Sequence, residues 1–182
     1  MFDVRHRFVT SVLYELPFGG GKPFLQTGVG AAILGGWQIS TIVNASTGFP
    51  RTAYVGTDRS NTGGGQDRPN VVPGQDPELP SDQRTVQQWF NTNAYVLNDL
   101  GTFGNAGRNT FYGPGITSVD TSIIRNFRIS SKTLQFRLEG FNVLNNPIWN
   151  DPNTTLTSPL YGTITTTRKP MRELQVGIKF VF

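Results

Sequence analysis

The C-terminal segment, residues 173–182, alternates apolar and polar side chains along most of its length. The apolar parity consists of Leu174, Val176, Ile178, Phe180 and Phe182. The opposite parity begins with Glu173, Gln175, Gly177 and Lys179. Because successive side chains of a strand point to opposite faces, this segment is predicted to be a β-strand with one wholly apolar face. Such a face is stable where another protein layer or lipid shields it from water.

The same alternation recurs in four earlier segments. We expect strands near residues 4–17, 36–49, 117–129 and 132–145, with the last strand near 171–182. Within the fourth, the pattern slips at Gly140, because Phe141 and Val143 carry the apolar parity beyond it. A bulge at the glycine or an exit from the apolar zone would explain the slip. The five segments predict an all-β fold, an antiparallel up-and-down meander of about five long strands.

The connections between these strands differ in length. The second and fourth strands are followed by long segments, residues 50–116 and 146–170, which are rich in Gly, Pro, Asn and Asp. The third strand is followed by a short turn at residues 130–132, and the first by an intermediate segment, residues 17–36. In an antiparallel meander the two long connections therefore leave the sheet at the same end.

Two folds satisfy this pattern, a transmembrane β-barrel and a soluble β-sandwich. A barrel has long extracellular loops, short periplasmic turns, a lipid-facing apolar side and a polar lumen. Aromatic residues occur where barrels carry girdles, namely Tyr14, Trp37, Phe127, Phe180 and Phe182 near the periplasmic ends and Phe8, Phe49 and Phe141 near the outer ends. A sandwich would bury the same apolar side chains against a second sheet, but a loop as long as residues 50–116 is unusual there. We therefore favour the barrel.

Seven motifs stand out along the chain. They are Tyr-Glu-Leu-Pro-Phe-Gly at 14–19, Gly-Trp-Gln-Ile-Ser at 36–40, Thr-Gly-Phe-Pro at 47–50, Gln-Trp-Phe-Asn at 88–91, Gly-Thr-Phe-Gly-Asn-Ala-Gly-Arg-Asn at 101–109, Phe-Arg-Leu-Glu-Gly-Phe-Asn-Val-Leu-Asn at 136–145 and Gly-Ile-Lys-Phe-Val-Phe at 177–182. In this order they resemble the C-terminal barrel region of TonB-dependent outer-membrane receptors. The resemblance is to the acidobacterial type, which has a carboxypeptidase-regulatory-like N-terminal domain.

The resemblance implies a barrel of about twenty-two strands, of which residues 1–182 would supply a C-terminal segment. It implies a receptor in the cell outer membrane of a Gram-negative-type bacterium, a transporter for uptake of a bulky nutrient of the siderophore, glycan or peptide class. The expected partners are outer-membrane lipid, the barrel-assembly machinery, and the rest of the barrel and its plug, with TonB acting through the missing N-terminal part. The start of the chain lacks a secretory signal, so we expect a fragment or a truncated reading frame. The alternative function is a soluble β-rich carbohydrate- or ligand-binding module.

Two groups of residues are candidates for function. The last strand resembles the β-signal that the assembly machinery recognises, a terminal aromatic preceded by apolar residues at every second position. The residues that match it are Leu174, Val176, Ile178, Phe180 and Phe182. In the first long loop, Trp89, Phe90 and Tyr95 could either stack on a sugar or siderophore or pack the loop onto the barrel rim. Both interpretations remain open.

Residues suited to catalysis or metal binding are scarce. His6 is the only histidine and cysteine is absent, so we expect neither a catalytic triad nor a histidine or thiolate metal site. Residues 58–67 lack the EF-hand spacing, and residues 101–107 lack the Lys-Ser of a phosphate loop. The 16 basic and 12 acidic residues are scattered, which argues against nucleic-acid binding. We therefore expect no enzyme activity, cofactor, metal or nucleic acid.

The charged residues on the polar parity have a different expected use. They are Arg137, Glu139, Glu173 and Lys179. Because side chains on neighbouring strands lie close together on one face, we expect these four to form cross-strand ion pairs inside the barrel.

Overall fold

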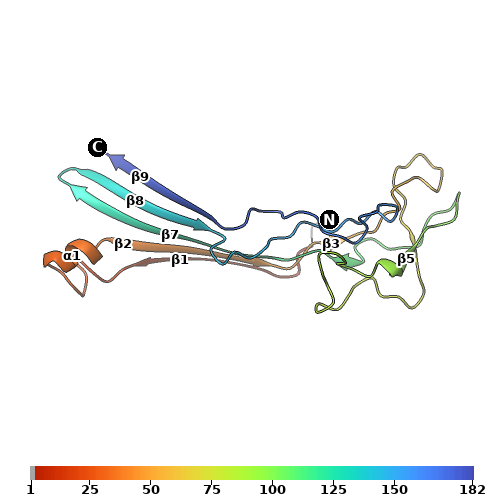
Figure 1. Ribbon diagram of the computed structural model, residues 1–182, viewed down its shortest axis with the longest axis horizontal. Helices are drawn as coiled ribbons and strands as arrows, with labels where there is room; N and C mark the ends of the chain where they lie inside the picture. Colours follow the sequence, from red (N-terminus) through yellow and green to blue (C-terminus); the bar gives the residue numbers. More distant parts are fainter. Residues whose placement is uncertain (1–2) are drawn as a thin grey trace. The chain divides into compact units, whose positions relative to one another are not determined.

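The computed structural model describes residues 3–182, and of residues 128 and 129 the backbone only. Five strands form one antiparallel sheet in the order β1-β2-β7-β8-β9 (Figure 1). They are β1 (Arg7–Glu15), β2 (Trp37–Ser46), β7 (Ile116–Ile129), β8 (Lys132–Phe141) and β9 (Glu173–Val181). These five strands follow each other across the sheet in chain order, which confirms the predicted all-β meander.

The strands have the length that a bilayer requires. A strand tilted by about 45° crosses the hydrocarbon core with roughly 9–11 residues. β1 and β9 have nine residues each, and β2 and β8 have ten. β7 is longer, with fourteen residues. Most strands are shorter at their ends than the sequence pattern suggested, because the alternation continues into the connections.

The register of the last three strands places apolar and polar side chains on separate faces. Directly paired residues lie on the same face of a sheet. One face carries the row Ile123, Leu138 and Val176 and the row Phe127, Leu134 and Phe180. The other face carries the row Asn126, Gln135 and Lys179 and the row Ser122, Glu139 and Gln175. The segregation predicted from the sequence therefore follows from the hydrogen-bonded pairing itself.

The first two strands continue the apolar face. The Oγ1 atoms of Thr41 and Thr121 lie 3.3 Å apart, so these two residues share a face. The backbone N–H of Leu16 donates to the carbonyl of Trp37 at 2.9 Å. This pairing places the apolar parity of β1 on the same face as that of β2. Among the side chains that the structure describes, no large apolar one of this face is buried: those of the edge strand β9 are exposed, Ile178 to 73%, and those of the inner strands are half-buried or exposed. In a soluble sandwich they would instead be buried against a second sheet.

The slip in alternation after residue 139 has a local cause. The ladder runs through Gly140, opposite Thr121, to Phe141, opposite Glu173, so the expected alternative of a bulge at the glycine is wrong. The interruption occurs at Asn142, which has a φ of 50° and whose N–H donates to Asp120 Oδ1 at 2.8 Å. Strand β8 therefore ends at Phe141, in agreement with an exit from the apolar zone.

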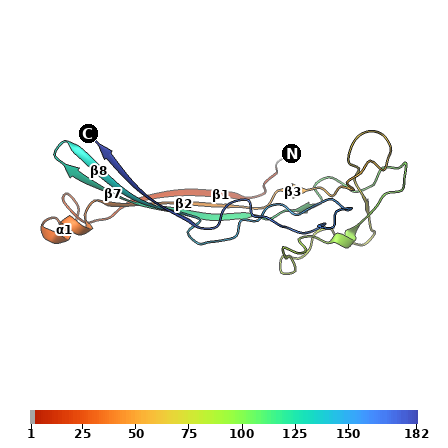
Figure 2. The ribbon, with the colours of Figure 1, turned by 45° about the horizontal axis from the view of Figure 1, so that its top comes forward.

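The two shorter connections lie at one end of the sheet. A tight turn at Ser130, with a φ of 57°, joins β7 to β8. At the same end, the connection from β1 to β2 contains a helix that the sequence analysis did not predict, α1 (Gly28–Leu34) (Figure 2). Helices of the described chain are all too short or too polar to cross a membrane.

The two long connections form a compact unit separate from the sheet. This loop unit comprises Ser46–Ile116 and Ile148–Lys169, together with residues 3–6. Its secondary structure is short: β3 (Pro50–Arg51) pairs with β6 (Phe111–Tyr112), β4 (Asn70–Val71) pairs with β5 (Tyr95–Val96), and η1 (Thr92–Ala94) is one 3-10 turn. The first long connection, residues 50–116, therefore contains several short elements.

The assignment of the faces predicts the effect of a charge at matched positions of β8. Leu138→Arg, on the apolar face of the complete barrel, should destabilise the protein in lipid vesicles by about 2–4 kcal/mol if that face meets the middle of a bilayer. Gln135→Arg, on the polar face, should change stability little. Urea unfolding in vesicles measures both, and equal losses of stability would contradict the assignment.

Candidate functional site

The loop unit has a hydrophobic core of its own. Phe90, only 1% exposed, stacks on Phe111 with 4.1 Å between ring centroids. The ring of Tyr161, from the second long connection, meets Phe90 edge-on at 5.2 Å. Burial raises the pKa of the Tyr161 hydroxyl, as it does that of Tyr95 in the same core. The two connections therefore fold together around shared aromatic rings.

The three loop aromatics selected from the sequence belong to this core or line it. Phe90 and Tyr95 are buried, and the Tyr95 hydroxyl forms a hydrogen bond with Thr110 Oγ1. Trp89 is partly buried, and its indole N–H donates to the carbonyl of Tyr112 at 2.9 Å. Of the two interpretations, this geometry supports packing of the loop.

A half-buried carboxylate also joins the two connections. Asp151 forms two ion pairs. Its Oδ2 lies 3.2 Å from a guanidinium nitrogen of Arg51, and its Oδ1 lies 3.1 Å from one of Arg168. The guanidinium of Arg168 also lies over the ring of Phe49, 5.9 Å from its centroid. Since Arg51 belongs to the first connection and Asp151 to the second, their ion pair links the two connections.

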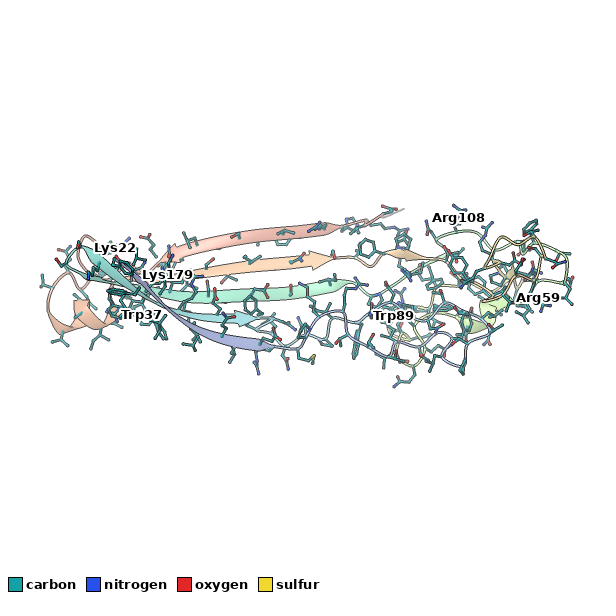
Figure 3. The ribbon with its side chains drawn as sticks, turned by 90° about the horizontal axis from the view of Figure 1, so that it is seen from above. Lys22, Trp37, Arg59, Trp89, Arg108 and Lys179 are labelled. Carbon is teal, nitrogen blue, oxygen red and sulfur yellow. The ribbon has the colours of Figure 1, made fainter. Side chains whose placement is uncertain are left out.

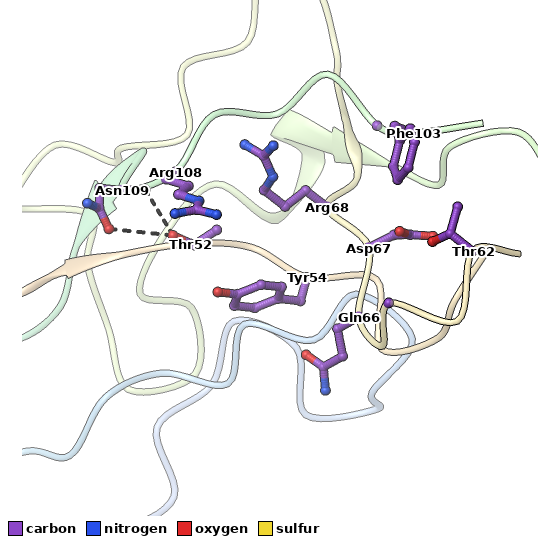
Figure 4. A pocket seen from close by; sticks show the side chains of 11 residues that line it. Thr52, Tyr54, Thr62, Gln66, Asp67, Arg68, Phe103, Arg108 and Asn109 are labelled. Atoms are coloured by element: carbon purple, nitrogen blue, oxygen red, sulfur yellow. Dashed lines mark hydrogen bonds between the residues drawn. The ribbon is translucent and has the colours of Figure 1, made fainter. Parts of the chain in front are cut away.

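A pocket of about 510 Å³ opens in the loop unit. Tyr54, Arg68 and Arg108 lie around its space, and Phe103 stands at its edge (Figure 4). The Phe103 ring is 72% exposed. Gly104 lines the pocket where a Cβ would lie 1.9 Å from the carbonyl oxygen of Arg68, so only glycine fits this close approach. The pocket therefore combines aromatic rings with guanidinium groups.

The charges of this pocket favour an anionic ligand. Both Asp67 oxygens accept hydrogen bonds from Ser60, at 2.6 Å from its N–H and 3.0 Å from its hydroxyl. Arg68 donates to the carbonyl of Ala106 at 2.7 Å, whereas exposed Arg108 has no hydrogen bond or ion pair within residues 3–182. A planar guanidinium binds carboxylate or phosphate through two parallel hydrogen bonds. The pocket can thus hold an oxygen-rich anionic group beside an aromatic ring.

Sequence reasoning did not select these pocket residues, although one signal was present. The motif at 101–109 contributes Phe103, Gly104 and Arg108 to the pocket. The opposite side comes from residues 52–68, which the fold alone brings close to that motif. One side of the pocket therefore lies in a motif that stood out in the sequence, although not as a binding site.

The acidic turn at residues 58–67 is held by its own backbone. Asp58 accepts hydrogen bonds from the N–H of Gly63 at 2.6 Å and the hydroxyl of Ser60 at 2.9 Å. These bonds, led by that from Gly63, lower the pKa of the Asp58 carboxyl. Within residues 3–182 no group of three or more acidic, histidine or cysteine side chains is arranged to hold a metal ion.

The polar face of the sheet forms a network of amides and charges. Arg137 donates to Gln135 at 3.2 Å and pairs with Glu139 at 3.4 Å, and Gln135 donates to Asn126 at 2.8 Å. Among residues 3–182, none of the four charged residues of this face forms the expected cross-strand ion pair. Arg137 and Glu139 pair along one strand, whereas Lys179 lies opposite Gln135 and Glu173 lies opposite Phe141. Register, which sequence parity does not give, decides these partners.

The candidate assembly residues lie on β9 and just beyond it. β9 is an edge strand that pairs with β8 alone in the described sheet. The side chains of Leu174, Val176, Ile178, Phe180 and Phe182 are exposed, Phe182 to 90%. The strand therefore presents an apolar row that the described chain does not cover.

The comparisons with known proteins agree with this architecture. The family described as outer membrane beta barrel domain matches residues 1–175. No curated protein and no solved structure shows a significant match to the chain. The match covers all of β1, β2, β7 and β8 and the whole loop unit. The chain therefore belongs to the outer membrane beta barrel domain family, which locates it in the outer membrane of a Gram-negative-type cell.

Proposed function

We propose that this chain is the C-terminal barrel region of a TonB-dependent receptor that takes up a bulky nutrient of the siderophore, glycan or peptide class. The observation that carries the proposal is the loop unit, with its own aromatic core and a pocket of about 510 Å³. A pore that passes small solutes by diffusion needs only an open rim. A folded loop unit with a pocket suits selective capture of a ligand.

The ligand would present an anionic, oxygen-rich group. Arg108 would bind that group, while Tyr54 and Phe103 would contact an adjacent ring or apolar surface. The polar face of the sheet would line the lumen through which the ligand passes. The seven sequence motifs support a receptor whose plug and TonB contact lie in the N-terminal part of the complete protein.

The proposal includes the rest of the barrel as a partner. β1 and β9 form the two edges of the described sheet. An open edge leaves backbone groups unpaired, which hydrocarbon does not tolerate. Other strands of the receptor would pair with both edges, and the barrel-assembly machinery would recognise β9 during insertion.

Uptake measurements in the bacterium test the function. We expect deletion of the gene to abolish uptake of one class among labelled ferric siderophores, glycans and peptides, and the restored gene to recover it. A protonophore should abolish the recovered uptake, because TonB transmits the proton-motive force. Arg108→Gln should raise the half-saturating ligand concentration about tenfold, the effect of losing about 1.4 kcal/mol of binding.

The matched control is Lys169→Gln, which removes an exposed charge of the loop unit that does not line the pocket. It should leave uptake unchanged. Uptake that persists under the protonophore would contradict TonB dependence, and equal effects of the two variants would contradict the role of the pocket.

Removal of Phe182 tests the assembly signal. Because this side chain is 90% exposed, its loss sacrifices little packing in the folded protein. We therefore expect the complete receptor without Phe182 to reach the outer membrane at a much lower level than Trp89→Ala, which alters only the loop unit. The amount of heat-modifiable barrel in outer-membrane fractions measures this level. Equal levels of the two variants would argue against recognition of the terminal aromatic.

A further inference from the structure

The helix α1 is unusual for a connection at the end of a sheet. Its seven residues, Gly28–Leu34, contain no polar or charged side chain. None of them is buried, and the side chain of Val29 is 75% exposed. A helix this short is unstable in water without tertiary contacts, and exposed apolar side chains mark a surface that meets an apolar partner. The apolar surface extends to Phe24 and Leu25, which are also exposed.

Two side chains hold the end of α1 on the apolar side of the sheet. The indole N–H of Trp37 donates to the carbonyl of Ile33 at 2.9 Å. The guanidinium of Arg125 donates to the carbonyl of Ala32. Trp37 has the parity of Thr41 on β2, and Arg125 has the parity of Thr121 on β7, so both belong to the apolar face. The helix therefore continues the surface that faces lipid.

The surroundings of α1 have the character of a membrane interface. Arg125 lies over the rings of Phe127, at 4.3 Å, and Trp37, at 5.2 Å. Lys132 lies over Phe180 at 5.8 Å. Aromatic rings gather at the level of lipid headgroups, and long cationic side chains extend from apolar surfaces toward phosphate. Figure 3 shows Trp37 among the side chains gathered at this end of the sheet.

We infer that α1 is an interfacial helix that inserts its apolar side chains into the periplasmic leaflet of the outer membrane. The occupant of its exposed surface is phospholipid, with acyl chains against Val29 and Ile33 and anionic headgroups near Arg125 and Lys132. The shorter connections of a barrel lie on the periplasmic side, which identifies the leaflet. This inference rests on the barrel assignment and not on the transport proposal.

The inference also explains why an arginine occupies the apolar face. Arginine on the lipid face is strongly destabilising at the bilayer midplane but costs little near the interface. Arg125 lies five residues before the turn at Ser130, close to the periplasmic end of β7. There it binds a carbonyl of α1 and remains near headgroup phosphates. The helix and Arg125 would together fix the depth of the barrel in the membrane.

Quenching of a fluorescent label tests the position of α1. The complete barrel, in a background without other cysteines, is labelled at Val29→Cys and reconstituted in vesicles of phosphatidylethanolamine and phosphatidylglycerol. Ser131→Cys, in the polar turn between β7 and β8, is the matched control. The label at position 29 should be quenched by brominated acyl chains and protected from aqueous iodide. The label at position 131 should show the reverse.

Two results would overturn the inference. Iodide quenching at position 29 as strong as at position 131 would place α1 in water. Protection from both iodide and brominated lipid would mean that a protein surface, such as another part of the receptor or a second copy, covers the helix. Far-UV circular dichroism and heat-modifiability establish that each labelled protein is folded.

Discussion

Hydrogen-bonded pairing of the backbone between neighbouring strands determines which face of the sheet each side chain occupies. In hydrocarbon each N–H and C=O needs a partner, and the register that provides those partners also assigns every side chain to a face. Leu138 lies between Ile123 and Val176, whereas Gln135 lies between Asn126 and Lys179. A slip of one residue in β8 would exchange these environments. The register therefore separates the surface for lipid from the surface for water.

The same meander explains how the loop unit arises. Antiparallel order sends the connections after β2 and β8 out of the same end of the sheet, so two segments distant in sequence start close together. Phe90 and Tyr161 then share one core, and Asp151 pairs with Arg51 across the two connections. A pocket with fixed walls needs this mutual support, because either loop alone would have few apolar side chains to bury.

The sequence predicts those features that depend on local alternation. The five strands, the apolar parity and the different lengths of the connections all follow from a period of two. Features that depend on distant contacts were missed. Helix α1, with two glycines, has little intrinsic stability and is held by Trp37 and by Arg125, which lies more than ninety residues away. The pocket likewise requires residues 52–68 to meet the motif at 101–109, which no local pattern reveals.

The outward orientation of the apolar face is the central claim, and spin-label accessibility measures it most directly. The chain contains no cysteine, so single nitroxides can be attached at Val176→Cys and Gln175→Cys in the reconstituted barrel. Membrane-soluble oxygen should relax the label at position 176, and a water-soluble nickel chelate should relax the label at position 175. Equal accessibility at the two positions, or a label at 176 shielded from both reagents, would contradict this account.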